Sequence, residues 1–186
     1  MAKFIDFDSI IKTDWTKPSI QKNPLWIVAA LGAVAALVSL FVNWITLDTS
    51  IKVMGDEALH KNLISAPFDN SEAIVILVAL VFVAYGLLYR QWGVATIAGL
   101  VIFIFSGGYM IDAIQQNATI ATDGDEYTLK QLSDRVKHVV EMLRNDYGQN
   151  NVTHFTSVGG YGFIFAVIGG FLTTVCSFLL YKKSNK

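Results

Sequence analysis

Residues 72–112 read EAIVILVALVFVAYGLLYRQWGVATIAGLVIFIFSGGYMID, and this stretch decides the fold. Two apolar runs, 73–89 and 93–111, are separated only by the short turn 90–92. Neither run contains Asp, Glu, Lys, Arg or His. A helix needs about 20 apolar residues to cross the hydrocarbon core of a bilayer. The stretch therefore predicts two antiparallel membrane spans joined by a tight turn, with Arg90 at the water boundary.

Two further runs, 25–47 and 158–181, have similar length and are also free of charged side chains. The whole chain of 186 residues is 53% apolar and only 16% charged, with a mean hydropathy of +0.47. Soluble domains carry about a quarter of their residues as charges. These numbers predict an all-α integral membrane protein: one membrane domain, built as a bundle of four transmembrane helices and solvated by the lipid bilayer.

The distribution of charge predicts the orientation of this bundle. The N-terminal segment, Arg90 and the tail 182–186 together carry eight Lys and Arg against three Asp. The two long loops, 48–72 and 112–157, carry twelve acids against six bases. Cytoplasmic segments are enriched in Lys and Arg. We therefore expect both termini in the cytoplasm and both long loops outside, in a multi-pass protein of the plasma membrane.

Outside the spans, two shorter segments are predicted to be helical. In residues 1–23, Phe4, Phe7, Ile11 and Trp15 recur at helical spacing, which predicts an amphipathic helix lying in the cytoplasmic interface. In the first long loop, a short helix is expected around residues 56–63.

The second long loop contains the clearest amphipathic pattern, over residues 128–147. Thr128 and Gln131 match a capping box at its start, and Gly148 matches a C-terminal stop. Its apolar residues fall on one helical face: Leu129, Leu132, Val136, Val139, Val140 and Leu143. Such a face must cover something apolar, and three alternatives are open: the mouth of its own bundle, the outer leaflet or a partner.

Small residues recur at four-residue spacing in the spans and predict a helix-packing interface. The set comprises Gly162, Ala166 and Gly170 in the fourth span, and Ala95 with Gly99 in the third. Small side chains let helix backbones approach closely in lipid. The pattern fits packing within this bundle, and it also fits docking of the fourth span against another membrane subunit.

The sequence contains no pattern typical of catalysis or of a cofactor site. No Asp, Glu, Lys, Arg or His lies within the spans, so a proton-coupled transport path is not expected. Asp56, Glu57 and His60 would share one face of a helix, but a metal site needs three or four converging ligands, and no metal is expected. The net charge of −1 gives no basic field for nucleic acid. Cys176, the one cysteine, lies in an apolar run and is expected to be a buried thiol.

The layout resembles that of tetraspan proteins in general, but the family-specific cysteines are missing. No cysteine pair follows Trp44 as in claudins, and the large loop has no Cys-Cys-Gly as in tetraspanins. We expect a non-enzymatic accessory or assembly subunit that packs against a larger membrane complex or against itself. The alternatives are a homo-oligomeric pore and a membrane immunity or exclusion protein.

Overall fold

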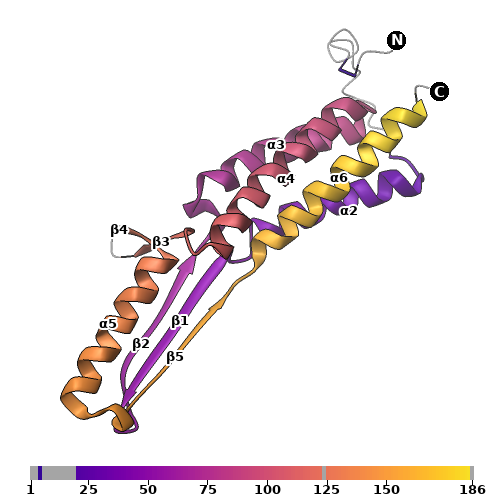
Figure 1. Cartoon of the computed structure of the whole chain (residues 1–186). Helices are drawn as coiled ribbons and strands as arrows, with labels where there is room; N and C mark the ends of the chain where they lie inside the picture. Colours follow the sequence, from indigo (N-terminus) through magenta and orange to yellow (C-terminus); the bar gives the residue numbers. More distant parts are fainter. Residues whose placement is uncertain (1–3, 6–19, 123–124, 185–186) are drawn as a thin grey trace.

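The computed structural model describes residues 4–5, 20–122 and 125–184. Its helical bundle consists of α2 (Pro24–Ser39), α3 (Ser71–Leu88), α4 (Trp92–Ile114) and α6 (Gly162–Ser184). A sheet domain follows the bundle at the end opposite the start of α2 and the end of α6 (Figure 1). The molecule is therefore elongated, with apolar helices at one end and a mixed sheet and helix at the other.

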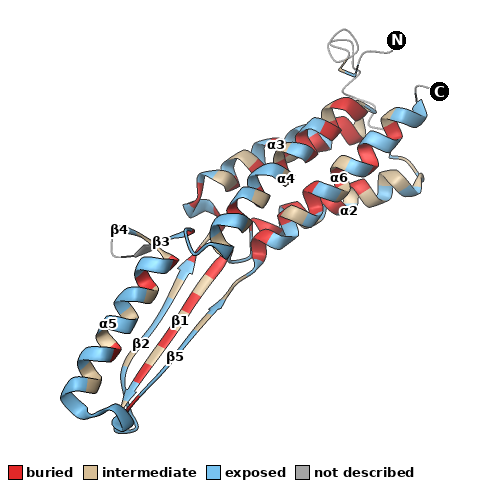
Figure 2. Ribbon diagram, in the orientation of Figure 1, coloured by how far each residue is buried: buried red, intermediate tan, exposed pale blue. Residues whose placement is uncertain are grey.

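These four helices are each long and apolar enough to cross a membrane. Figure 2 shows that their buried positions form narrow stripes facing the bundle axis. In α2 the buried residues are small, Ala29, Gly32, Ala36 and Ser39, whereas large residues such as Leu31 and Val34 are exposed. Small residues inside and large apolar residues outside are typical of helices packed in lipid. The four helices thus fit a membrane protein.

A close backbone contact joins α2 to α6. A Cβ built at Gly32 would lie 2.8 Å from the carbonyl oxygen of Gly169, and one built at Gly169 would lie 2.7 Å from the backbone nitrogen of Ala36. The hydroxyl of Thr173 donates a hydrogen bond to the carbonyl of Ala29, at 3.1 Å. The first and last helices of the described bundle are therefore held together by close backbone contact and by this hydrogen bond.

The predicted tight turn joins α3 to α4, and Arg90 within it has a positive φ of 60°. A Cβ at Gly86 would lie 2.6 Å from the nitrogen of Ala95, so this hairpin is also closely packed near its turn. The indole of Trp26 donates to the carbonyl of Leu87, at 3.0 Å, and links α2 to the same end.

The sheet domain contains three antiparallel strands in the order β2–β1–β5, drawn from both loops. The first loop forms β1 (Ile45–Val53) and β2 (Asp56–Ser65), and the second loop returns as β5 (Val152–Gly159). Met54 and Gly55 connect β1 to β2 with φ values of 53° and 92°. Two consecutive positive φ angles suit a tight hairpin between twisted strands, and glycine adopts the second at little cost.

The remaining elements of the second loop precede β5. A hairpin of β3 (Thr119–Thr122) and β4 (Asp125–Thr128) leads into α5 (Leu129–Tyr147). Short 3-10 turns lie at Pro67–Asp69, before α3, and at Gln149–Asn151, before β5. The side chain of Thr128 accepts from the nitrogen of Gln131, and Gly148 ends the helix, so the predicted capping of α5 is confirmed.

Three sequence predictions are corrected by this fold. The all-α class is wrong because the loops form strands. The helix expected at 56–63 is strand β2, which pairs with β1 with one register shift near Ile51. The first apolar run, 25–47, is not one helix: α2 ends at Ser39, and Ile45 already begins β1. The predicted interfacial helix over residues 1–23 lies mostly outside the described residues.

Candidate interaction surface

Most buried hydroxyls of the described spans are hydrogen-bonded inside the bundle, and that of Ser177 is the exception. Ser39 donates to the carbonyl of Ala36 at 2.6 Å, and Ser106 donates to that of Ile102 at 2.6 Å. Thr96 donates to its own helix in the same way. Serine and threonine can satisfy themselves on the preceding turn, which removes the cost of burying a hydroxyl. These buried hydroxyls therefore present no polar surface to the outside of the helices.

The small residues predicted to form a packing interface are buried in contacts between helices of this same chain. Gly162, Ala166 and Gly170 of α6 are buried, as are Ala95 and Gly99 of α4. A Cβ at Gly170 would lie 2.6 Å from the nitrogen of Phe103 in α4. Of the two alternatives left open by the spacing, packing within the bundle accounts for these five residues, and they are not accessible to a second protein.

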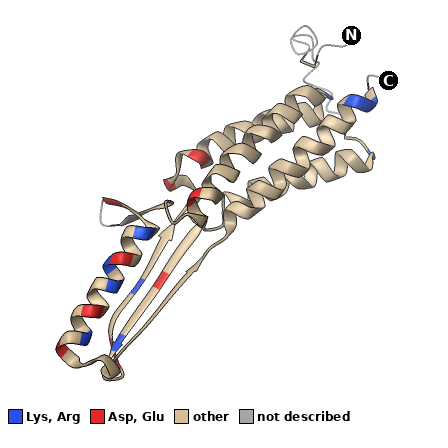
Figure 3. Cartoon of the chain, in the orientation of Figure 1, with Lys and Arg blue, Asp and Glu red and all other residues tan. Residues whose placement is uncertain are grey.

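The apolar stripe of α5 is covered by the sheet of the same chain. Val140 packs in a cluster with Ile51 of β1 and Val152 of β5. Val136, Val139 and Leu143 pack against this cluster, while Leu129 and Leu132 belong to the core that continues into the bundle. The charged residues of α5 are exposed except for the half-buried Arg144, and Figure 3 shows them spread along the helix. The helix is thus an internal cover for one face of the sheet.

The opposite face of the sheet is not covered by any described residue. Along β1, the side chains at 45, 47, 49 and 51 are buried toward α5, whereas those at 46, 48, 50 and 52 are only partly buried or exposed. Side chains alternate between the two faces of a strand, so the second set belongs to the uncovered face. We call this surface the open face.

Strand register defines the residues of the open face in four rows. The row at the bundle end contains Ile64, Thr46 and Gly159, and three rows follow toward the tip. Of these three, the central row contains His60, Ser50 and Phe155, which lie opposite one another in β2, β1 and β5. The row nearer the bundle contains Asn62, Asp48 and Ser157, and the row nearer the tip contains Glu57, Lys52 and Thr153. Phe155 is 63% exposed and Ile64 is 43% exposed, and they are the large apolar side chains in a surface that otherwise carries mainly hydroxyls, amides and charges.

Charged groups on the open face lie beside opposite charges or a histidine. The Nε2 of His60 lies 3.1 Å from Oδ1 of Asp48, and its Nδ1 lies 2.9 Å from Oε1 of Glu57. Lys52 lies opposite Glu57 in the register. Cross-strand pairs of opposite charge stabilise a sheet modestly. These groups therefore form a surface of mixed charge, with two carboxylates, one lysine and one histidine.

Of the three residues considered for a metal, Glu57 and His60 lie together on the open face, with 2.9 Å between Oε1 and Nδ1. Asp56 lies opposite Val53, the next residue of β1 after Lys52, and so belongs to the other face of the sheet. Within the described residues, no group of three or more His, Cys, Asp or Glu side chains could hold a metal ion. The absence of a bound metal stays a prediction.

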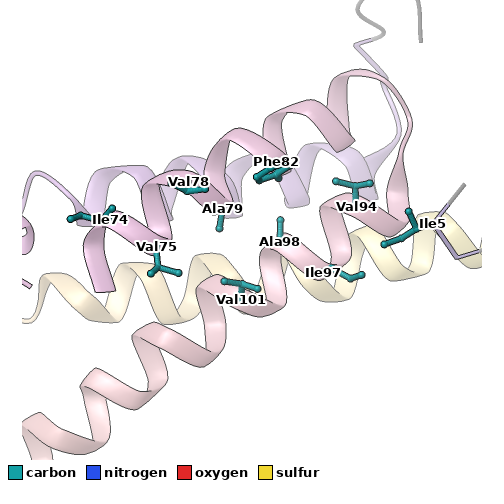
Figure 4. Close-up of a pocket in the computed structure, with 10 residues that line it drawn as sticks. All are labelled: Ile5, Ile74, Val75, Val78, Ala79, Phe82, Val94, Ile97, Ala98 and Val101. Atoms are coloured by element: carbon teal, nitrogen blue, oxygen red, sulfur yellow. The ribbon is translucent and has the colours of Figure 1, made fainter. Parts of the chain in front are cut away.

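An apolar groove of about 430 Å³ runs between α3 and α4 (Figure 4). Its walls include Val78 and Phe82 of α3 and Ile97 and Val101 of α4, and Ile5 lies at one end. The lining is aliphatic and aromatic, so the groove can accept only an apolar group. It lies on the surface of the candidate spans.

Sequence reasoning missed the open face because it missed the strands. No protein-family model matches the chain, and no curated protein matches it. The function of this surface must therefore be argued from its own chemistry.

Proposed function

We propose that the chain is a non-enzymatic accessory or assembly subunit that holds a partner protein on the open face of its sheet domain. In this proposal the four helices anchor the chain in the plasma membrane, both termini are cytoplasmic, and the sheet domain lies outside. The single observation that supports it most is the uneven covering of the sheet. One face is sealed by α5, while the other presents Phe155 among small polar side chains.

The composition of the open face favours protein recognition over catalysis. Interfaces concentrate aromatic residues at their centre and place polar residues around them. Phe155, on the edge strand β5, has Ser50 and Ser157 beside it, while the charged groups lie on β1 and β2. No described residues on this face form an activated nucleophile next to a base within a pocket, which is the arrangement that a hydrolase requires.

The buried hydroxyls argue against the alternative of a homo-oligomeric pore. A pore made by several copies needs polar groups on the outer surface of each bundle. Here Ser39, Ser106 and Thr173 are fully buried and bonded within the chain. The outer surfaces of the four helices are instead rich in large apolar side chains.

Co-purification of the full-length chain from native membranes tests the proposal. A C-terminally tagged chain would be solubilised in mild detergent, alongside Ser50→Arg with Asn62→Arg on the open face and Lys137→Glu on the outward face of α5 as matched control. We expect a partner protein with the wild type and the control, and its loss with the open-face variant. Equal recovery of the same protein with all three chains would refute the role of the open face.

A further inference from the structure

The open face alone is small for a stable complex. A strand of nine residues is about 30 Å long, and three strands are about 14 Å wide, which gives an area of about 400 Å². A specific interface buries about 800 Å² on each partner. Under the proposed function, a partner must therefore contact a second surface of the sheet domain.

The exposed edge of β5 is continuous with the open face and has free hydrogen-bonding groups. The nitrogen of Met54 donates to the carbonyl of Asn151, at 2.7 Å. Because bonded and non-bonded pairs alternate in an antiparallel ladder, the backbone groups of His154 and Thr156 point away from β1. The hydroxyl of Tyr161 donates a hydrogen bond to the carbonyl of Val158, at 3.1 Å, which fits a carbonyl that points away from β1. No described residue bonds the backbone groups of His154 and Thr156 that face outward.

This edge lacks the features that normally protect a sheet from another strand. Natural edge strands carry lysine, proline or a bulge that prevents pairing. β5 contains none of Lys, Arg, Asp, Glu or Pro, and its pairing with β1 is continuous. The other edge strand, β2, carries Asp56, Glu57 and Lys61, and the register of the β1–β2 pair shifts near Ile51. Only one of the two edges is therefore open to strand addition.

A groove of about 280 Å³ lies beside the same edge, between β5, α5 and the end of α4. Thr156 and Val158 form its β5 side, Leu129 and Ser133 come from α5, and Ile114 comes from α4. Ile114 is 72% exposed and Val158 is 48% exposed. In strand addition, backbone bonds supply affinity and pockets for alternate side chains supply specificity. The groove is placed to receive such a side chain.

From these observations we infer that the β5 edge binds an extended segment of a different polypeptide, which adds as a fourth strand and places an uncharged side chain in the groove. This inference rests on the proposed function and names its partner class. The added strand would extend the sheet beyond Phe155, so that the open face and the edge are contacted together.

A second copy of this chain does not fit the edge. Two copies in one membrane are related by an axis along the membrane normal, and β5 roughly continues the direction of the bundle (Figure 1). Their β5 strands would then be parallel, with each residue directly opposite the same residue of the other copy. In a parallel ladder, a residue hydrogen-bonds to the two neighbours of the residue opposite it. Two strands related by an exact twofold axis along their length cannot make this pattern. An antiparallel ladder would direct the two bundles into different membranes.

Photo-crosslinking of the full chain in native membranes tests this inference. A benzophenone amino acid would be placed singly at His154, Phe155 and Thr156, with His138 and Glu141 on α5 as controls. We expect the three β5 positions to cross-link, in order, to successive residues along one segment of one partner. The double substitution His154→Lys with Thr156→Lys would be combined with the probe at Phe155. It should lower the cross-linking yield from that probe by about tenfold, because charged side chains on an edge strand oppose pairing. Lys137→Glu should leave that yield unchanged.

Three results would overturn the inference: adducts only with lipid, adducts only with a second copy of the chain, or adducts scattered over several segments of the partner. Probes at Ser50 and Asn62 separate this failure from that of the proposed function. If those open-face probes capture a partner while the β5 probes do not, the open face binds and strand addition is wrong. If neither set captures a protein, both proposals fall.

Discussion

Gly32 and Gly169 are the residues on which the contact between α2 and α6 depends. Both helix backbones come so close that a Cβ at either position would collide with backbone atoms of the other helix. We expect Gly169→Val to destabilise the bundle by about 3 kcal/mol, since overpacking a closely packed site forces backbones apart. Thermal unfolding in detergent measures the effect.

Gly107 offers a matched control for this substitution. It lies in α4, and a Cβ built there would meet nothing within 4 Å beyond its chain neighbours and the adjacent backbone of its own helix. Gly107→Ala should keep or slightly raise the melting temperature, since alanine favours a helix over glycine by about 1 kcal/mol. Equal destabilisation by the two variants would show that the close approach of α2 and α6 is not what limits stability.

Thr173 and Thr174 give a second residue-scale prediction, on hydrogen bonding between helices. The hydroxyl of Thr173 bonds across to Ala29 of α2, whereas that of Thr174 bonds to Gly170 in its own helix. Thr173→Val should cost about 1 kcal/mol, the usual range for an interhelical bond in a membrane protein. Thr174→Val should be near neutral. Unfolding of both variants in the same detergent compares them, and a larger loss for Thr174→Val would contradict the assignment.

At the scale of elements, the cap of α5 should control how firmly this helix covers the sheet. Thr128 accepts from the nitrogen of Gln131, and the side chain of Gln131 accepts from the nitrogen of Thr128. Thr128→Ala should cost about 1 kcal/mol. Hydrogen exchange in the first turn of α5 should then accelerate about fivefold if local opening governs it. Thr128→Ser keeps the hydroxyl and should exchange like the wild type; a similar acceleration in both would argue against the cap.

The helices could be predicted from the sequence because each has a complete local signal. Three of the spans are long runs without charges, and α5 has a period, an N-cap and a glycine stop, all found where they were expected. The strands could not be placed so simply. In β1 the alternation of Ile45, Leu47 and Ile51 directly follows the apolar residues after α2, so the two signals merge into one apparent run.

The open face and the β5 edge could not be predicted because they depend on pairing between distant segments. β5 lies about a hundred residues from β1 in the chain, and nothing local in VTHFTSVG specifies its partner. The small residues of α6 were identified from their spacing, but spacing alone does not tell whether the neighbouring helix belongs to the same chain. Tertiary contacts decide that point, and here they place Gly170 against α4.

For the whole molecule, the proposed orientation predicts which residues a reagent outside the cell can reach. Cys176 is buried and would be replaced by serine to give a background without thiols. In intact cells, a membrane-impermeant maleimide should label Ser50→Cys on the open face. It should label Ser184→Cys, at the end of α6, only after permeabilisation. The reverse pattern would place the sheet domain in the cytoplasm and overturn the orientation.

The central claim is that this chain works by binding a different protein, and the mass of the intact assembly tests it most directly. The chain alone has a mass of 20.5 kDa. Native mass spectrometry of the complex released from membranes in mild detergent should give one assembly containing this chain and a second polypeptide in fixed ratio. A mass equal to the single chain, or only to whole multiples of it, would contradict the account.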